Sequence, residues 1–288
     1  MQNARRDFYL LLDTCICCAY AVTMWLERFQ NDAHFKGVLL RENEPPVSLQ
    51  RERDDFHRHY AGQRLSTAEE LHELRQLYPY LDEAEEAMLR LFGLPKYSIN
   101  QVPNTFFLGK DINGAAAQDW VKEHLGESQP YLFSHLGQLV KPCWMEVAGG
   151  NLFNVHSAVL PYARGIYSIE NVAASQDLDL FLKSAGMTIH LIDEGVDTGP
   201  IMSAHRIRDP FRFDSIWALK GYAYYKGYEL YADFAKRLLS DPAVMPVPVK
   251  SHPSFWGPNY KYKDFTEQQK RRAEKGYLAL KALPKRGS

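Results

Sequence analysis

The chain has 288 residues, of which 45% are hydrophobic and 24% are charged, a composition typical of one large globular domain or of one domain with a small appendage. Its formal net charge of −1 offers no positive field for nucleic acid, so the composition argues against a nucleic-acid partner. No apolar run is long enough to span a membrane.

The N-terminal segment imitates a secretion signal, because Arg5-Arg6 precede an apolar run from Phe8 to Val22. Asp13 interrupts that run, and an amphipathic pattern continues it. We therefore expect a strand at about Phe8–Leu12, followed by a turn of small residues and a helix. Gly37–Leu40 is expected to form a second buried strand, which closes a first βαβ unit.

Three of the four cysteines lie close together in the sequence, at Cys15, Cys17 and Cys18. Cysteines this close on one segment do not pair easily, so the pattern is not a disulfide framework, and it fits a reducing cytoplasm. A zinc site would need a fourth ligand from a distant part of the chain, so we expect no metal.

Residues 47–93 have a charged, helical pattern. Ser66-Thr67-Ala68-Glu69 has the form of a capping box at the start of one helix, and Asp82–Phe92 is expected to form another. Packing against the sheet is the simpler interpretation of this helical insert. A lid on the acceptor side of a binding site is the functional alternative.

The residues with the strongest chemical signal begin at Asn154. Asn154 and His156 are two apart on an expected strand, so their side chains point to the same face. An amide N–H can hold a developing oxyanion, and an imidazole can handle a proton near pH 7. Asp197 lies in the glycine-containing turn 193–200, which can bring it to the imidazole, fix the ring and favour its charged form.

A second strand is expected at Met187–Leu191, where apolar and polar residues alternate. His190 lies opposite the apolar set on this strand, and we assign it a structural role. His135 carries no signal of its own, so contact with solvent or core is the simpler interpretation.

These motifs resemble a known family. Asn-x-His at 154–156, Leu-Pro-x-x-Arg-Gly at 160–165 and Asp-Glu-Gly-Val-Asp-Thr-Gly-Pro at 193–200 resemble, in order and approximate separation, the folate-dependent formyltransferases, which include glycinamide ribonucleotide and methionyl-tRNA formyltransferases. The resemblance covers roughly residues 95–207. The chain departs from the family at Ala158, where a serine is usual.

The resemblance implies an α/β fold: a Rossmann-like formyltransferase domain with a mostly parallel sheet, a helical insert and a smaller C-terminal extension. It also implies 10-formyltetrahydrofolate as donor, an amine as acceptor, and a catalytic trio of Asn154, His156 and Asp197. The family's Asp-Ile-Asn signature is present at 111–113, where Asn113 is expected to cap the next helix. The residues expected to bind the folate are Gln138, Leu139, Val140, Asp193, Gly195 and Val196.

Three residues are candidates for binding the acceptor. Arg164 is expected either to grip a carboxylate or phosphate with two donors or to brace its own loop. Tyr162 lies in the same loop, and Trp256 lies in an aromatic segment that offers a stacking wall.

The expected reaction is attack of the amine on the formyl carbon. Hydrolysis of 10-formyltetrahydrofolate by the same trio is a second hypothesis, and a non-catalytic folate or nucleotide binder is a third. Nucleotide-linked amino sugars and the N5-hydroxyornithine of siderophore biosynthesis are both open as acceptors, and the long insert favours a small amino-acid-like amine.

We therefore expect a catalytic domain at residues 7–207, which contains the insert at about 47–93, and a helical, aromatic extension at 208–284. The expected partner is a small-molecule amine, with no nucleic acid and no membrane, in the cytoplasm. A homodimer is left open.

Overall fold

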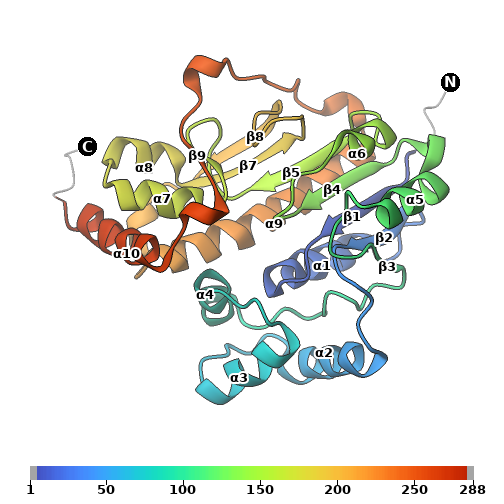
Figure 1. The fold of residues 1–288 in the computed structure, drawn as a ribbon, viewed down its shortest axis with the longest axis horizontal. Coiled ribbons are helices and arrows are strands. Elements are labelled where there is room, and N and C mark those ends of the chain that lie inside the picture. The colour runs from blue at the N-terminus through green and yellow to red at the C-terminus, as the bar shows by residue number, and fades with distance from the viewer. Residues whose placement is uncertain (1–4, 284–288) are drawn as a thin grey trace.

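A seven-stranded, mostly parallel sheet forms the centre of the computed structural model, which describes residues 5–283 (Figure 1). The strand order is β3-β2-β1-β4-β5-β7-β8, and β7 is the strand of this sheet that runs antiparallel to its neighbours, β5 and β8. This confirms the predicted α/β fold class. The strands are β1 (Phe8–Leu12), β2 (Phe35–Leu40), β3 (Thr105–Phe107), β4 (Tyr131–His135), β5 (Leu152–His156), β7 (Gly186–Leu191) and β8 (Ile201–Arg206).

Both faces of the sheet are buried, since side chains alternate between the faces along each strand. On β1, Leu10 and Leu12 join the core with α1 and α9, whereas Leu11 joins a second core with α5 and α6. The predicted first βαβ unit is therefore present. These helices are α1 (Ile16–Phe29), α5 (Ala115–His124), α6 (Pro142–Val147) and α9 (Ile216–Ser240).

The helical insert consists of α2 (Val47–Tyr60), α3 (Ala68–Leu77) and α4 (Glu83–Phe92). The capping box of α3 forms one residue later than expected, between Thr67 and Glu70, and a second box between Asp82 and Glu85 starts α4. The insert does not pack directly on the sheet. Its apolar residues join the core on the outer side of α1, and α4 lies against α9, as Figure 1 shows.

Helix α9 lies within the expected C-terminal extension, but it is part of the main core. The Phe234 ring is 5.3 Å from Phe153 on β5, and Tyr231 is 5.3 Å from Trp25 on α1. The domain boundary at residue 207 remains a prediction, and the packing of α9 in the main core argues against it. Residue 284, the expected end of the extension, lies outside the described residues.

The remaining elements lie at the β7 side of the molecule, where α10 packs on α7 (Figure 1). The approach is close: a side chain on Gly276 of α10 would place its Cβ 2.0 Å from the Ala173 carbonyl oxygen. No helix within residues 5–283 has the length and apolar character to cross a membrane. The elements here are α7 (Ser168–Ser175), α8 (Leu178–Ser184), α10 (Glu267–Ala282) and a two-stranded parallel ribbon of β6 (Arg164–Gly165) and β9 (Asn259–Tyr260).

Replacement of Phe234 by alanine tests whether α9 belongs to the main core. The side chain is 1% exposed, so Phe234→Ala should lower the free energy of unfolding by about 3–5 kcal/mol, the usual result of deleting a buried aromatic ring. Phe255 is 69% exposed, and Phe255→Ala should change it by about 0.5 kcal/mol or less. Denaturant unfolding followed by circular dichroism measures both. A near-neutral Phe234→Ala variant would contradict the assignment.

Candidate active site

A cavity of about 480 Å³ opens at the carboxyl ends of β1, β4 and β5. The chain moves outward from β1 to β3 and then returns to β4 on the other side of β1, so the strand order reverses here. Ligands of open α/β sheets bind at this kind of switch point. The cavity is lined by residues of these three strand ends, the insert, α9 and the segment 259–262.

Asn154 is held by its neighbour across the sheet. It pairs with His190 on the antiparallel strand β7, and its Nδ2 lies 3.1 Å from Nε2 of that ring. The other ring nitrogen, Nδ1, lies 2.8 Å from the Leu191 carbonyl oxygen, which only accepts. Nδ1 therefore carries the hydrogen of the neutral ring, and Nε2 accepts one amide N–H. The second amide N–H is left for a ligand.

His156 is 8% exposed and is fixed on both sides. Its Nε2 is 3.1 Å from the Ala163 carbonyl oxygen, so Nε2 donates and Nδ1 is the basic nitrogen. Nδ1 faces Asp197 Oδ2 at 3.5 Å. Burial lowers the pKa of the imidazole below its usual value, and the Asp197 charge opposes this. The resting ring is therefore neutral at pH 7 and faces a partner that stabilises it once it is protonated.

Asp197 is the common partner of this group. Burial opposes its ionisation, but His156 and His190 together hold the pKa of its carboxyl far below the usual range. Oδ2 accepts the Gly165 N–H at 2.7 Å, and Oδ1 lies 3.4 Å from His190 Nε2. The structure thus brings the three predicted catalytic residues together and adds His190, to which sequence reasoning gave a purely structural role. The position of His190 on the polar face of β7 was the sequence feature that could have indicated this contact.

The residues predicted to bind the folate gather around a smaller hollow of about 80 Å³, next to Asn154. Five of the six residues line it, and Val196 lines the larger cavity. Asp193 turns its Oδ1 to Thr198 Oγ1 at 2.6 Å and to the Gly195 N–H, so its carboxylate shapes the turn. The five residues are Gln138, Leu139, Val140, Asp193 and Gly195.

Asn113 stabilises the loop on the other side of this hollow. Its Nδ2 donates to the Leu139 carbonyl oxygen at 2.8 Å, and its Oδ1 accepts the Lys141 N–H at 2.9 Å. The prediction that Asn113 caps a helix is wrong, because Gly114 holds the cap position of α5. The family's Asp-Ile-Asn signature therefore fixes the backbone of the expected folate loop.

The three residues expected to bind the acceptor do not line either hollow. Arg164 donates to the Gly257 and Val196 carbonyl oxygens, and its guanidinium lies 4.8 Å from the Trp256 ring. Of the two alternatives for Arg164, the structure favours the bracing of loops. Tyr162 is 37% exposed on the outer side of the same contact. The geometry does not favour direct substrate contact by these side chains.

Other residues form the wall instead. The insert contributes Tyr80, Asp82 and Glu85, which favours the functional interpretation of the insert over simple packing. Helix α9 contributes Lys220, whose Nζ lies 3.3 Å from the buried Glu170 carboxylate, and Tyr224 from its tyrosine stripe. Sequence patterns indicated Asp82 only as the start of a helix, which is no signal for a binding site. An aromatic stripe at helical spacing is usually core or interface. This stripe consists of Tyr222, Tyr224, Tyr225, Tyr228 and Tyr231.

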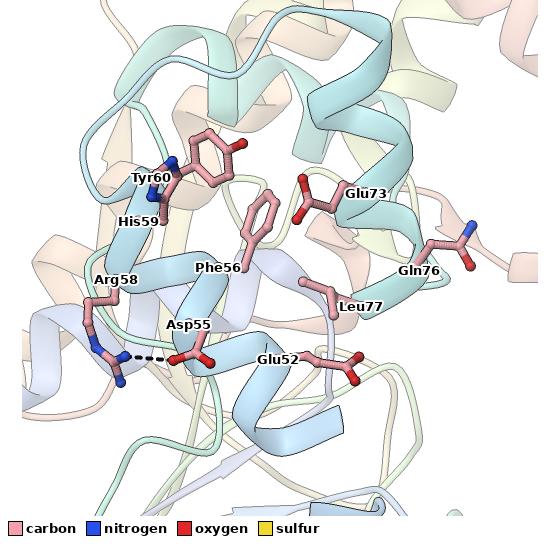
Figure 2. A pocket seen from close by; sticks show the side chains of 9 residues that line it. All are labelled: Glu52, Asp55, Phe56, Arg58, His59, Tyr60, Glu73, Gln76 and Leu77. Carbon is pink, nitrogen blue, oxygen red and sulfur yellow. Dashed lines mark hydrogen bonds and ion pairs between the residues drawn. The ribbon is translucent and has the colours of Figure 1, made fainter. Parts of the chain in front are cut away.

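A larger hollow of about 880 Å³ lies between α2 and α3 (Figure 2). Its polar lining residues are all exposed or half-buried, and Asp55 is paired with Arg58 at 2.6 Å. Exposed groups of this kind keep their water, so they supply little of the electrostatic control that catalysis needs. The candidate active site is therefore the cavity of about 480 Å³ that Asn154 lines, and not the hollow between α2 and α3.

Sequence comparison matches residues 93–208 to the family model described as formyl transferase. A phosphoribosylglycinamide formyltransferase of Bacillus subtilis is 31% identical over 109 residues, which cover 37% of this chain and 53% of that protein. A methionyl-tRNA formyltransferase of Kosmotoga olearia is 32% identical over 102 residues, 35% of this chain and 31% of that protein. The chain thus spans about half or less of the length of these curated relatives.

Solved structures share the fold. A sugar N-formyltransferase from a Shewanella species has a TM-score of 0.53 at 13% identity and covers 94% of this chain and 88% of that one. An N-formyltransferase from Helicobacter canadensis, in complex with folinic acid and dTDP-3-aminofucose, has a TM-score of 0.52 at 14% identity, with 94% and 80% covered. Identities this low establish a common fold alone.

The protonation of His156 tests the geometry of the site. Its pKa should lie below the usual value of about 6.5, because burial disfavours the charged ring. Asp197 raises the pKa of that ring, so Asp197→Asn should lower it further. Histidine nuclear magnetic resonance titration measures this, with the His156 signal identified by its loss in His156→Gln. Glu194→Gln, in an exposed position of the same turn, should leave the pKa unchanged. An equal or higher pKa in Asp197→Asn would show that the carboxylate does not act on the ring.

Proposed function

From the premise that residues 93–208 are a folate-dependent formyltransferase domain, as the sequence motifs predicted, we propose that the chain transfers a formyl group from 10-formyltetrahydrofolate to the amine of a small acceptor. One observation carries the proposal. Asn154, His156 and Asp197 converge on one cavity at the switch point of the sheet, with an oxyanion donor, a neutral base and a fixed carboxylate.

In this mechanism the amine attacks the formyl carbon, and the carbonyl oxygen gains negative charge. The free N–H of Asn154 donates to that oxygen, and His190 keeps the amide in position. His156 Nδ1 takes the proton of the amine directly or through one water, and Asp197 stabilises the imidazolium that results. Collapse of the intermediate releases tetrahydrofolate, and the same imidazolium is the source of a proton for the leaving nitrogen.

The proposal assigns the pterin of the donor to the hollow of about 80 Å³. Its walls include the loop 138–140 and the turn residues 193–195, whose main-chain N–H and C=O groups are of the kind that suits the edge of a flat pterin. Asn113 and Asp193 hold these two segments by hydrogen bonds, so the wall is formed before the ligand arrives. The donor supplies the formyl group, and the chain supplies its placement beside Asn154.

The lining of the cavity of about 480 Å³ favours a small cationic or zwitterionic acceptor. Asp82 and Glu85 line the part contributed by the insert, and burial raises the pKa of Asp82 to about 6 and that of Glu85 well above its usual value. Asp13, which follows β1, is already paired with Arg41, so Asp82 is the acid that can attract a cation near pH 7. Lys220 is already paired with Glu170, which leaves Lys261 as the unpaired lining lysine among the described residues for a diphosphate. This balance suits an amino-acid-like amine such as N5-hydroxyornithine in siderophore biosynthesis better than a nucleotide-linked amino sugar.

The proposed transfer needs no metal ion. The amide, the imidazole and the carboxylate together stabilise the oxyanion and move the proton, which are the two tasks that the reaction sets. A cytoplasmic location goes with the proposal, because the four free cysteines suit a reducing compartment.

Release of tetrahydrofolate in the presence of candidate amines tests the function. The protein should release it only with the right amine, and mass spectrometry should show that this amine has gained a formyl group. Screening N5-hydroxyornithine, ornithine and dTDP-linked amino sugars in parallel identifies the acceptor class. Equal release without any amine would instead identify a hydrolase and overturn the proposal.

Two variants serve as controls for this assay. Asn154→Ala removes the oxyanion donor and should lower turnover by about 100- to 1,000-fold. His156→Ala removes the base and should lower it by about 100- to 10,000-fold. Both should still bind a folate analogue, because His156 does not line the pterin hollow and Asn154 is only one of the residues that line it.

A further inference from the structure

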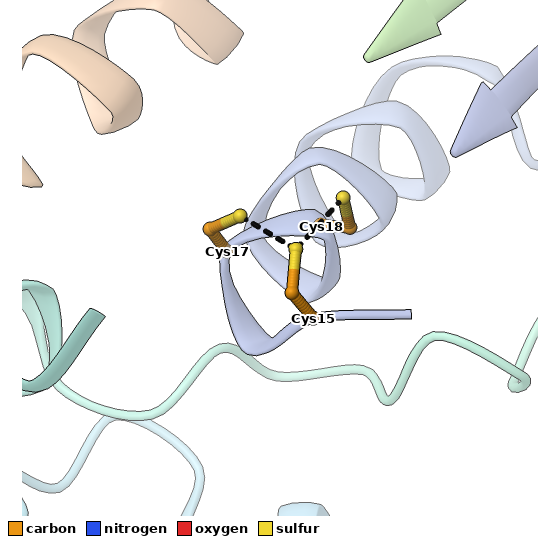
Figure 3. A group of neighbouring side chains, drawn as sticks. All are labelled: Cys15, Cys17 and Cys18. Atoms are coloured by element: carbon orange, nitrogen blue, oxygen red, sulfur yellow. Dashed lines mark hydrogen bonds between the residues drawn. The ribbon is translucent and has the colours of Figure 1, made fainter. Parts of the chain in front are cut away.

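Three cysteine sulfurs meet at one end of the cavity, and the proposed formyl transfer does not use them (Figure 3). Cys15 lies between the other two: its Sγ is 2.8 Å from Cys17 Sγ and 3.3 Å from Cys18 Sγ. All three sulfurs lie within 4.8 Å of one another. The start of α1 gathers them on one side, whereas the sequence led us to expect no metal, because a fourth ligand would have to come from a distant part of the chain.

We propose that Cys15, Cys17 and Cys18 bind one zinc ion, with the fourth coordination position directed toward the cavity. Zinc–sulfur bonds of about 2.3 Å in a tetrahedral site place the sulfurs about 3.8 Å apart. The observed separations of 2.8 Å and 3.3 Å and the limit of 4.8 Å lie on both sides of that value. Small rotations of the three side chains therefore suffice to admit the ion.

The start of α1 favours negative charge on the central sulfur of the cluster. Cys15 is the N-cap of α1, where the partial positive charge of the helix terminus stabilises thiolates. Glu85 accepts the Cys17 N–H at 3.1 Å and so holds the backbone of this turn.

A route to the sulfurs is available. Cys15 and Cys17 line the cavity, so an ion can reach them from solvent. The three sulfurs are the grouped ligand atoms among the described residues, which leaves the fourth position to a ligand from the cavity, such as water.

Binding changes protons and not electrons. Three S–H bonds break, three Zn–S bonds form, and the protons leave to solvent. Soft thiolates select zinc over magnesium or calcium, which prefer oxygen ligands. The ion would link the start of α1 to the cavity wall, at a site separate from Asn154, His156 and Asp197. Its removal should therefore leave amine-dependent formyl transfer in place.

Elemental analysis of the protein, purified with a reductant and without chelator, tests the proposal. We expect about one zinc ion per chain, and none after exhaustive chelation. Cobalt added to the chelated protein should give sulfur-to-metal charge-transfer absorption and the visible bands of tetrahedral cobalt. Cys15→Ser, at a half-buried position, should abolish both signals, and Cys143→Ser, at a half-buried cysteine on α6, should abolish neither.

A folded variant and an independent readout keep the test decisive. Circular dichroism and folate-analogue binding establish that Cys15→Ser is folded, and zinc protection of the parent's thiols from alkylation needs no variant at all. Three protected thiols support the site. Three results would each overturn the proposal. The first is zinc bound equally by Cys15→Ser, and the second is the absence of cobalt–thiolate absorption. The third is a mass lower by two hydrogens in the freshly purified chain, which would reveal a Cys15–Cys18 or Cys15–Cys17 disulfide. None of these outcomes depends on the acceptor or on the formyl donor.

Discussion

The carboxylate of Asp197 organises the candidate site, because it keeps a negative charge in a place where burial opposes it. Its backbone has a φ of 50°, a left-handed conformation that few residues other than glycine adopt. The turn that holds it is tight: a side chain on Gly199 would lie 1.8 Å from the Leu191 carbonyl oxygen. The turn therefore delivers one oxygen to His156 and the other to His190.

Asp197 contacts two histidines, to which we assign different roles. His156 is buried and neutral at rest, and it gains a counter-ion only when it takes a proton. His190 in its neutral form accepts an N–H of Asn154 and so orients the amide. The same Nε2 lies 3.4 Å from Asp197 Oδ1. The oxyanion donor and the base thus share a single carboxylate.

The sheet positions the site residues, and the insert contributes to the wall of the cavity. The pairing of β5 with β7 places Asn154 opposite His190, and the ends of β1 and β4 form the adjoining wall. The insert packs on the outer side of the helices, yet its α4 brings Asp82 and Glu85 into the cavity. The insert thus contributes to the cavity wall from outside the sheet, whereas Asn154 and His156 lie on a strand of the sheet.

Much of the fold was predictable because strand and helix periodicity is local. Phe8–Leu12 has the expected bounds, the strand expected around Asn154 and His156 is present, and the Asn-x-His spacing was enough to place both side chains on one face. Properties that depend on distant packing were not predictable. Arg164 had two compatible roles until Gly257 and Val196 were seen to accept its hydrogen bonds. The inclusion of α9 in the main core depends on contacts such as Phe234 with Phe153, which no local pattern indicates.

The account's central claim is that Asp197 acts on the reaction through His156, and the pH dependence of kcat/KM tests it most directly. The acidic limb of the parent reports the pKa of the base in the free enzyme. In Asp197→Asn the maximum should fall, and the acidic limb should move to lower pH, because the imidazolium loses its counter-ion. Near-normal activity with an unmoved acidic limb would contradict the account.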